Sequence, residues 1–172
     1  ITKKSLFIYD KAADCPTWKM FLMQIFNKDT QLIKFIQKAC GYTLSGDVSE
    51  QCLFILWGTG ANGKSTFLNV LLQLFGDYGC STGIETFTKK NKEQSNDLAR
   101  LKGARLVTTS ELEQGSPMSE SLIKSVTGED ALTARFLYGE YFSFKPTFKI
   151  FMATNHKPKI RGADNGIWRR IK

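Results

Sequence analysis

The chain has 172 residues, 24 Lys and Arg against 16 Asp and Glu, and 42% hydrophobic residues. This size and composition favour a soluble globular domain with a sizeable core, and the net charge of +8 favours a polyanionic partner. No apolar run approaches the roughly 18 residues that span a bilayer, so we expect no membrane partner. Four widely spaced Cys and one His predict an intracellular protein without a disulfide framework or a zinc site.

Residues 1–50 are expected to form a small helical segment. Apolar residues recur at three- and four-residue spacing in TWKMFLMQIF and in TQLIKFIQKA, and Asp29 or Thr30 can cap the second helix. The stretch CGYTLSGDVSEQ then interrupts the pattern with glycines and polar residues. We therefore expect a boundary near residue 50, with a helical lead-in over 1–50 and a second unit over 51–172.

From Gln51 onwards short apolar runs alternate with helical stretches. The runs, in chain order, are CLFILW, STFLNVLLQLF, ARLVTTS, SESLIKSVTG and FKIFMAT. Such alternation is typical of an α/β fold with a central, mainly parallel sheet.

A glycine-rich stretch, WGTGANGKSTF, lies between the first strand-like run and the first helix-like run of this unit. It fits the pattern G-x-x-x-x-G-K-[ST], in which glycines let backbone N–H groups surround a phosphate and the lysine reaches the β- and γ-phosphates. The Ser hydroxyl that follows would bind Mg²⁺. The alternative is a plain turn that joins strand to helix. The expected nucleotide-binding residues are Gly58, Gly60, Asn62, Gly63, Lys64, Ser65 and Thr66.

Two strand-like runs end in polar residues suited to such a site. ARLVTTSELEQG offers Glu111, with Glu113 close behind, to hold Mg²⁺ or orient the attacking water. FKIFMATN ends in Asn155, whose amide can donate to the γ-phosphate and accept from the attacking water. An exposed loop glutamate and a turn-forming asparagine are the structural alternatives.

The stretch GIWRRI places Arg169 and Arg170 beside Trp168. Guanidinium groups stabilise the charge that develops on a transferring phosphoryl group, and a neighbouring subunit often supplies them. A basic surface turn is the alternative for at least one of the two.

Together, GTGANGKST, RLVTTSELE and the segment from LIKSVTGED to GIWRRI resemble the superfamily 3 helicases, in particular the primase-helicases of phages, plasmids and poxviruses. The resemblance covers about 51–172. It implies an AAA+-like, three-layer P-loop NTPase core that forms a hexameric ring, hydrolyses ATP with Mg²⁺ between subunits and translocates on single-stranded DNA. It also implies a replication protein of a mobile element, working in the cytoplasm of the host cell, with a primase domain in the same chain as a further expectation.

The resemblance assigns roles to individual residues. Lys64 and Ser65 correspond to the family's A motif, and Glu111 corresponds to its B motif. Lys124, Gly128 and Asp130 fall in the B′ region. Asn155 corresponds to the C-motif asparagine, and Arg169 or Arg170 would be the arginine finger. The chain departs from the family pattern in the B motif, because Ser110 precedes Glu111 where relatives often have two adjacent acids.

Many relatives also place a DNA-gripping hairpin with a basic tip between the B′ and C motifs. Here ARFLYGEYFSFKP is expected to be that hairpin, but Tyr138 and Glu140 flank its central Gly139. Tyr138 could replace a basic tip, because stacking on a base contributes about 1 to 3 kcal/mol and tolerates any sequence. Alternatively, these aromatics pack the hairpin against the core. The expected nucleic-acid contacts are Lys124, Arg135, Tyr138, Lys145 and Lys149.

Two other functions fit a phosphate-binding loop. A P-loop kinase for a small molecule or nucleotide is one, although no arginine-rich lid follows the core and Asn155 would have no role. A nucleic-acid-binding module that uses ATP only for assembly is the other. RNA is an alternative to DNA as the track.

Overall fold

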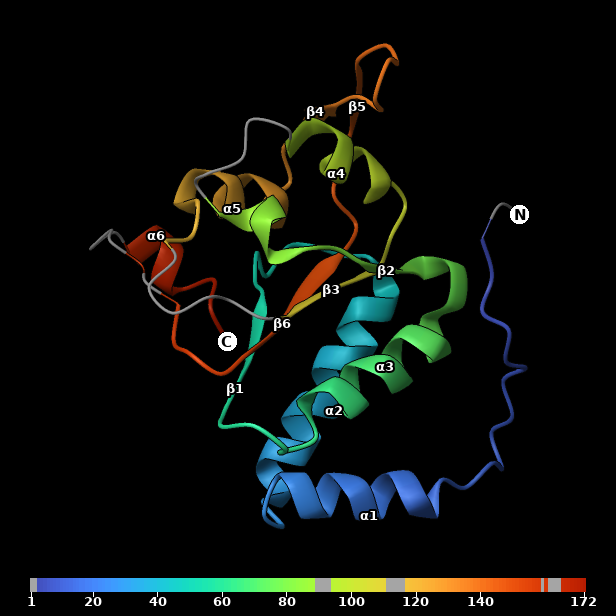
Figure 1. Ribbon diagram of the computed structural model, residues 1–172. Helices are drawn as coiled ribbons and strands as arrows, with labels where there is room; N and C mark the ends of the chain where they lie inside the picture. The colour runs from blue at the N-terminus through green and yellow to red at the C-terminus, as the bar shows by residue number, and fades with distance from the viewer. Residues whose placement is uncertain (1–2, 89–93, 111–116, 159, 161–164) are drawn as a thin grey trace.

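A computed structural model describes every residue except 1–2, 89–93, 111–116, 159 and 161–164 (Figure 1). Its centre is a parallel sheet of four strands, β1 (Phe54–Trp57), β2 (Gly79–Ser81), β3 (Leu106–Ser110) and β6 (Lys149–Thr154), in the order β1-β6-β3-β2. The predicted α/β class with a mainly parallel sheet is therefore confirmed.

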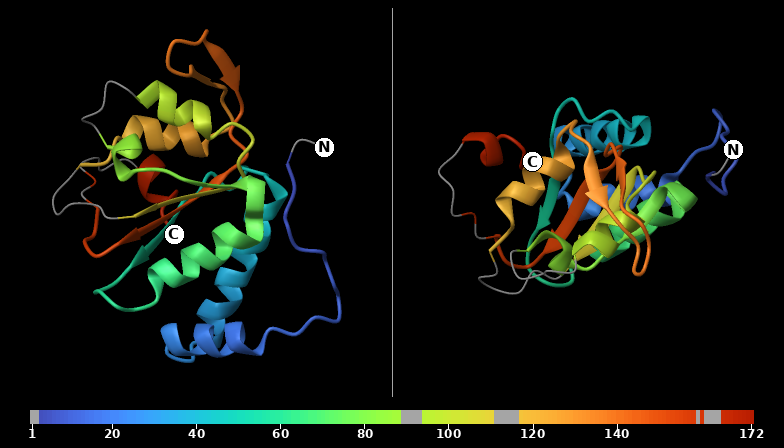
Figure 2. Two further views of the ribbon diagram at one scale, coloured as in Figure 1. Left: turned by 45° about the vertical axis from the view of Figure 1, so that its right-hand side comes forward. Right: turned by 90° about the horizontal axis from the view of Figure 1, so that it is seen from above.

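One face of the sheet is covered by α2 (Thr30–Ser45) and α3 (Lys64–Phe75), and α1 (Pro16–Ile25) lies beyond these two helices, on the side away from the strands (Figures 1 and 2). The carboxylate of Asp29 caps α2 by accepting hydrogen bonds from the N–H groups of the second and third helical residues, as the sequence predicted. A cluster of buried side chains joins these helices to the sheet, and it includes Leu22, Ile36, Leu71 and Phe151.

The helices α1 and α2 thus share a hydrophobic core with the sheet that follows them. The stretch CGYTLSGDVSEQ was expected to interrupt the helical pattern, but α2 continues through its first half to Ser45 and is capped by Gly46, which adopts the left-handed φ of +72° that glycine tolerates best. One interior glycine weakens a helix by only about 1 kcal/mol, so packing of α2 on the sheet overrides it.

The opposite face carries the short 3₁₀ helix η2 (Ile84–Phe87) and the helices α4 (Gln94–Arg100), α5 (Glu120–Thr127) and α6 (Asn165–Trp168) (Figure 2). A second buried cluster fills this side. Successive side chains of β6 point to opposite faces of the sheet and so enter different clusters. Ile150 and Met152 belong to this cluster, whereas Phe151 and Ala153 belong to the one on the other face. With helices on both faces, the three-layer arrangement is confirmed.

A two-stranded antiparallel hairpin, β4 (Leu132–Ala134) and β5 (Phe142–Phe144), stands apart from the main sheet (Figure 1). It confirms the predicted hairpin. The chain passes from β5 directly into β6, so the hairpin lies at the end of the sheet where β6 begins.

The last three residues run parallel to β1. Leu53 N–H donates to the Arg170 carbonyl, Lys172 N–H donates to the Leu53 carbonyl, and Ile55 N–H donates to the Lys172 carbonyl. These bonds extend the sheet along the outer edge of β1. Within the described part of the chain, every helix is too short or too polar to cross a membrane.

Candidate nucleotide-binding site

The site is built on the loop between β1 and α3, at the end of the sheet where β6 finishes. Gly63 caps α3 with a φ of +83°, and Ala61 also has a positive φ, of +58°. Such conformations favour glycine, and they close the loop tightly before Lys64 begins the helix. The positive end of the α3 dipole therefore faces the concavity that the loop encloses.

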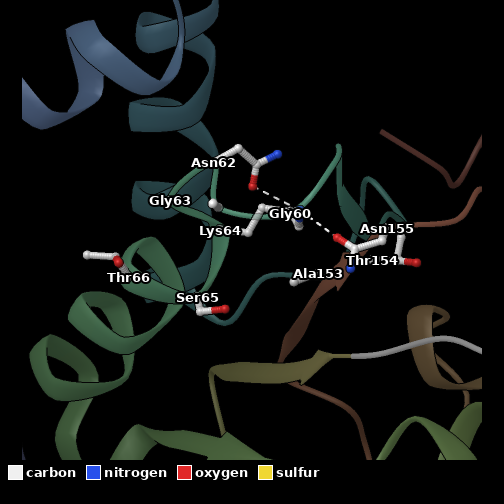
Figure 3. Close-up of a pocket in the computed structure, with 10 residues that line it drawn as sticks. Gly60, Asn62, Gly63, Lys64, Ser65, Thr66, Ala153, Thr154 and Asn155 are labelled. Carbon is white, nitrogen blue, oxygen red and sulfur yellow. Dashed lines mark hydrogen bonds between the residues drawn. The ribbon is translucent and has the colours of Figure 1, made fainter.

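The Lys64 ammonium group donates hydrogen bonds to four oxygens, and Figure 3 shows those from Asn62 and Asn155. Its Nζ donates to the carbonyls of Gly58 at 2.7 Å and Thr59 at 3.0 Å, to Oδ1 of Asn62 at 2.9 Å and to Oδ1 of Asn155 at 3.0 Å. Asn155 follows β6, so a residue from the neighbouring strand completes the arrangement.

A cavity of about 290 Å³ lies between the loop and the end of β6. Its lining residues are Gly60, Ala61, Asn62, Gly63, Lys64, Ser65, Thr66, Ala153, Thr154 and Asn155. The structure thus brings Asn155 together with the predicted loop residues, while Gly58 contributes its carbonyl to Lys64. Thr154 and Ala153 were not predicted as site residues; their position directly before Asn155, at a strand end, was the available signal.

The helical lead-in supports the loop from behind. A Cβ placed on Gly63 would meet Cγ2 of Ile25 at 2.7 Å and Cε2 of Phe21 at 3.2 Å. Both side chains belong to α1, so this helix touches the loop at the residue that caps α3. The position therefore requires glycine for space as well as for its φ.

The predicted acids Glu111 and Glu113 lie outside the described residues. Ser65, the predicted Mg²⁺ ligand, lines the cavity at the first turn of α3. No group of three or more His, Cys, Asp or Glu gathers elsewhere among the described residues in a way that could hold a metal.

The two candidate arginines differ in their surroundings. Arg170 is only 8% exposed; its Nε donates to Oγ1 of Thr127 at 3.1 Å and its Nη2 to Oε1 of Gln51 at 2.8 Å. Arg169 is exposed and also donates to Oε1 of Gln51. Neither lines the cavity beside Lys64. Gln51 was not predicted as the partner of these arginines, since it belongs to no motif of the sequence.

At the hairpin, Tyr138 is 98% exposed and adopts a φ of +60°. It does not pack against the core, unlike Phe142, which is half-buried and packs against the cluster on that side. Cζ of Arg135 lies 4.8 Å from the centre of the Tyr141 ring. Lys145, just after β5, is exposed. These groups form an exposed aromatic and basic surface.

Lys149 is the exception among the predicted nucleic-acid contacts. It is 1% exposed, because as the first residue of β6 it faces α2, where its Nζ lies 4.0 Å from the centre of the Tyr42 ring. The prediction that it contacts nucleic acid is therefore wrong. Lys124 lies in the last turn of α5 and is partly exposed.

Comparison with known proteins places the geometry in context. A family model described as "Family of unknown function (DUF5906)" matches residues 56–170. A "Putative helicase" of Acanthamoeba polyphaga mimivirus is 36% identical over 88% of this chain, and a "Putative helicase" of Frog virus 3 is 28% identical over 88%. "Primase D5" of fowlpox virus is 29% identical over 72% of the chain. Our chain spans 16% of the length of each of these three relatives.

Solved structures share the fold. The apo structure of the NrS-1 C-terminal region superposes with a TM-score of 0.65 at 14% identity, covering 90% of this chain and 36% of that one. The JCV helicase superposes with a TM-score of 0.54 at 14% identity, covering 88% and 41%.

Proposed function

Because this chain belongs to the DUF5906 family and is homologous to viral helicases and primases, we propose that it is the ATP-hydrolysing motor of a viral helicase. The observation that carries the proposal is the loop of residues 58–64, in which Lys64 is held between Asn62 and Asn155 and lines a cavity of about 290 Å³. Residues 51–172 form the motor, and 1–50 support its phosphate loop.

The site fits the triphosphate of ATP. Lys64 carries a compact ammonium group that now donates to carbonyl and amide oxygens. Phosphate oxygens can replace these acceptors, because they carry negative charge and form stronger hydrogen bonds with a cation. Gly58, Gly60, Asn62, Gly63 and Thr66 belong to the same loop and helix start. The Ser65 hydroxyl and the carboxylate of Glu111 would hold Mg²⁺, which supplies charge neutralisation to the β- and γ-phosphates.

Asn155 would then orient the attacking water. Its Oδ1 now accepts from Lys64, and the rest of its amide is available to a γ-phosphate or to water at the same cavity. When phosphate oxygens take over the contact with Lys64, the Asn155 amide is released for that second role.

The arginine finger would be Arg169, because it is exposed and can reach a neighbouring subunit in a hexameric ring. Arg170 is enclosed by the chain's own Gln51 and Thr127, so its role would be to fix the turn that presents Arg169.

Single-stranded DNA would bind at the hairpin. Tyr138 supplies an exposed aromatic surface, and Arg135 and Lys145 supply charge beside the hairpin strands. Lys124, in the last turn of α5, would supply a further positive charge. A primase domain elsewhere in the full polypeptide would use the strand that this motor exposes, in keeping with the name of the fowlpox relative.

The proposal is tested by measuring ATP hydrolysis with Mg²⁺, with and without single-stranded DNA or RNA, at two salt concentrations, with the oligomeric state recorded. We expect stimulation by DNA that weakens as salt rises, since phosphate contacts release counterions. Lys64→Ala should abolish hydrolysis in a folded protein, whereas Lys38→Ala, at an exposed position of α2, should not change it. Hydrolysis that ignores every nucleic acid, or transfer of phosphate to a small acceptor, would favour a kinase instead.

A further inference from the structure

We propose that Ser95 and Asn96, at the start of α4, are positioning residues that hold the hairpin loop, residues 135–141, in the orientation that binds single-stranded DNA. The inference rests on the proposed function, since it has a consequence only if the hairpin binds DNA. It also gives a role to a short polar helix that belongs to none of the sequence motifs.

The hairpin loop lies beyond the ladder that joins β4 to β5. The pairing of the two strands ends at Ala134 and Phe142. Between these residues, the Gly139 N–H donates to the Phe136 carbonyl at 2.9 Å. This bond lies within the loop and cannot orient it relative to the rest of the molecule, so contacts from outside must offset the entropy of fixing it.

The first turn of α4 supplies such contacts from its side chains. The Arg135 N–H donates to Oγ of Ser95 at 2.8 Å, and the Leu137 N–H donates to Oδ1 of Asn96 at 3.1 Å. Two consecutive side chains of the helix thus accept from two nearby N–H groups of the loop. A pair of bonds fixes a direction as well as a position, which one bond cannot do.

The helix is itself fixed to the core and touches the hairpin again at its far end. Leu98 and Ala99 are 7% and 1% exposed and belong to the buried cluster on that face of the sheet. Just after the helix, Nζ of Lys102 lies 4.7 Å from the centre of the Phe142 ring, at the start of β5. Figure 1 shows α4 beside the base of the hairpin. A helix anchored in this way is a firm support for the loop.

The consequence for DNA is a matter of populations. Tyr138 and Arg135 belong to the hairpin loop, and both are exposed. If the loop adopts several orientations, only a fraction of molecules presents these groups together, and the apparent affinity falls by that fraction. Ser95 and Asn96 therefore raise the affinity for DNA without touching it.

The first test measures the affinity of the whole chain for a labelled, single-stranded oligothymidylate by fluorescence anisotropy. Ser95→Ala and Asn96→Ala should each weaken binding about 2- to 10-fold, which is the change that one hydrogen bond makes in an equilibrium. Ser95→Thr keeps a hydroxyl acceptor and should restore the parental affinity.

Ser143→Ala is the matched control. The Ser143 hydroxyl bonds to that of Thr133 at 3.2 Å across the same hairpin, so its loss also removes one exposed side-chain hydrogen bond but leaves the contact with α4 intact. We expect this variant to match the parent in DNA affinity. Ser95→Ala and Ser143→Ala should have similar midpoints of urea denaturation, which separates an effect on the loop from an effect on overall stability.

The second test follows amide hydrogen exchange by NMR and reports on the hydrogen bonds themselves. In Asn96→Ala the Leu137 amide should exchange about 3- to 10-fold faster than in the parent, while the Ile150 amide in β6 should not change. Asn96→Asp keeps an acceptor oxygen and should keep the Leu137 exchange slow.

The outcomes separate this inference from the function on which it rests. Parental DNA affinity in Ser95→Ala and Asn96→Ala, or equal losses in Ser95→Ala and Ser143→Ala, would overturn the positioning role while leaving DNA binding by the hairpin intact. Unchanged exchange of the Leu137 amide in Asn96→Ala would also overturn it. A parent protein that binds no single-stranded DNA would overturn the proposed role of the hairpin, and this inference with it.

Discussion

Lys64 and Asn155 are 91 positions apart in the chain, yet the lysine Nζ donates a 3.0 Å hydrogen bond to the asparagine Oδ1. The parallel pairing of β1 with β6 brings them together, because both strands end at the same edge and Trp57 lies opposite Thr154. The contact joins the two elements that bind and sense a γ-phosphate in the proposed motor.

Replacing Asn155 with Ala should separate binding from turnover. Lys64 keeps three of its four oxygen partners, so we expect ATP affinity to change less than about threefold, whereas kcat should fall about 100- to 1000-fold, as when a polar group that stabilises developing charge is removed. Single-turnover hydrolysis and nucleotide titration measure the two effects. Asn69→Ala, at an exposed position of α3, is the control and should match the parent protein. A parental kcat in Asn155→Ala would remove this residue from the site.

We expect Gly63 and Gly60, both in the loop, to differ in how well they tolerate replacement by alanine. Gly63→Ala should destabilise the fold by about 1 to 3 kcal/mol, because its φ is +83° and its Cβ would meet Ile25 at 2.7 Å. Gly60→Ala should lie within about 0.5 kcal/mol of the parent, since a Cβ there has nothing within 4 Å. Urea denaturation followed by circular dichroism measures both. Equal stability of the two variants would show that α1 does not confine the loop.

Local signals in the sequence were sufficient for the glycine-rich turn between β1 and α3, the cap at Asp29 and the hairpin around Gly139, because each depends on a few neighbouring residues. Three-residue β2 was missed, since Gly79 and its neighbours have little strand propensity, and the polar helix α4 carries few apolar positions to reveal a period. The burial of Lys149 and the pairing of both arginines with Gln51 depend on contacts between distant segments, which residue spacing does not encode.

We expect Tyr138 to contribute to the binding of single-stranded DNA and not to the rate of ATP hydrolysis without DNA. If a base stacks on its ring, Tyr138→Ala should lose about 1 to 3 kcal/mol of affinity for single-stranded DNA, while Tyr138→Phe keeps the ring and most of the affinity. Fluorescence anisotropy with a labelled oligonucleotide measures the change. Tyr9→Ala is the control, since Tyr9 is 87% exposed and lies outside the hairpin. Unchanged DNA affinity in Tyr138→Ala would rule out the tip as a stacking platform.

We expect replacement of Arg170 by Ala to affect mainly stability, and replacement of Arg169 by Ala to affect mainly the rate of ATP hydrolysis. Arg170→Ala removes hydrogen bonds to Thr127 and Gln51 inside the fold, so it should lower the free energy of unfolding by about 1 to 3 kcal/mol. Arg169→Ala should leave stability and ATP binding unchanged and suppress turnover. Mixing it with Lys64→Ala protein should restore part of the hydrolysis if Arg169 acts on a neighbouring subunit. A mixed ring without any recovery would contradict action across the interface.

The buried Lys149 predicts an unusual dependence of stability on pH. Desolvation by burial lowers the pKa of its ammonium group to about 8, from an ordinary 10.5, and the nearby Asp47 carboxylate offsets this only in part. Its Nζ has no hydrogen-bond partner among the described residues and lies against the Tyr42 ring. Between pH 8 and 10.5 the unfolded chain therefore binds more protons at this site than the folded one, and stability contributed by Lys149 rises with pH across that window.

Below pH 8 both states carry the charge, so the full cost of burying it is present at neutral pH. Lys149→Met fills the same space without a charge, and we expect it to stabilise the fold by about 1 to 3 kcal/mol at pH 7 and to have little effect above pH 10.5. Lys145→Met, at an exposed position, should show neither effect. Urea denaturation at several pH values measures the difference between each variant and the parent. If Lys149→Met destabilises the protein at pH 7, and less so at pH 10.5, the ammonium group is stabilising the fold through its contact with Tyr42, and the assigned cost of burial is wrong.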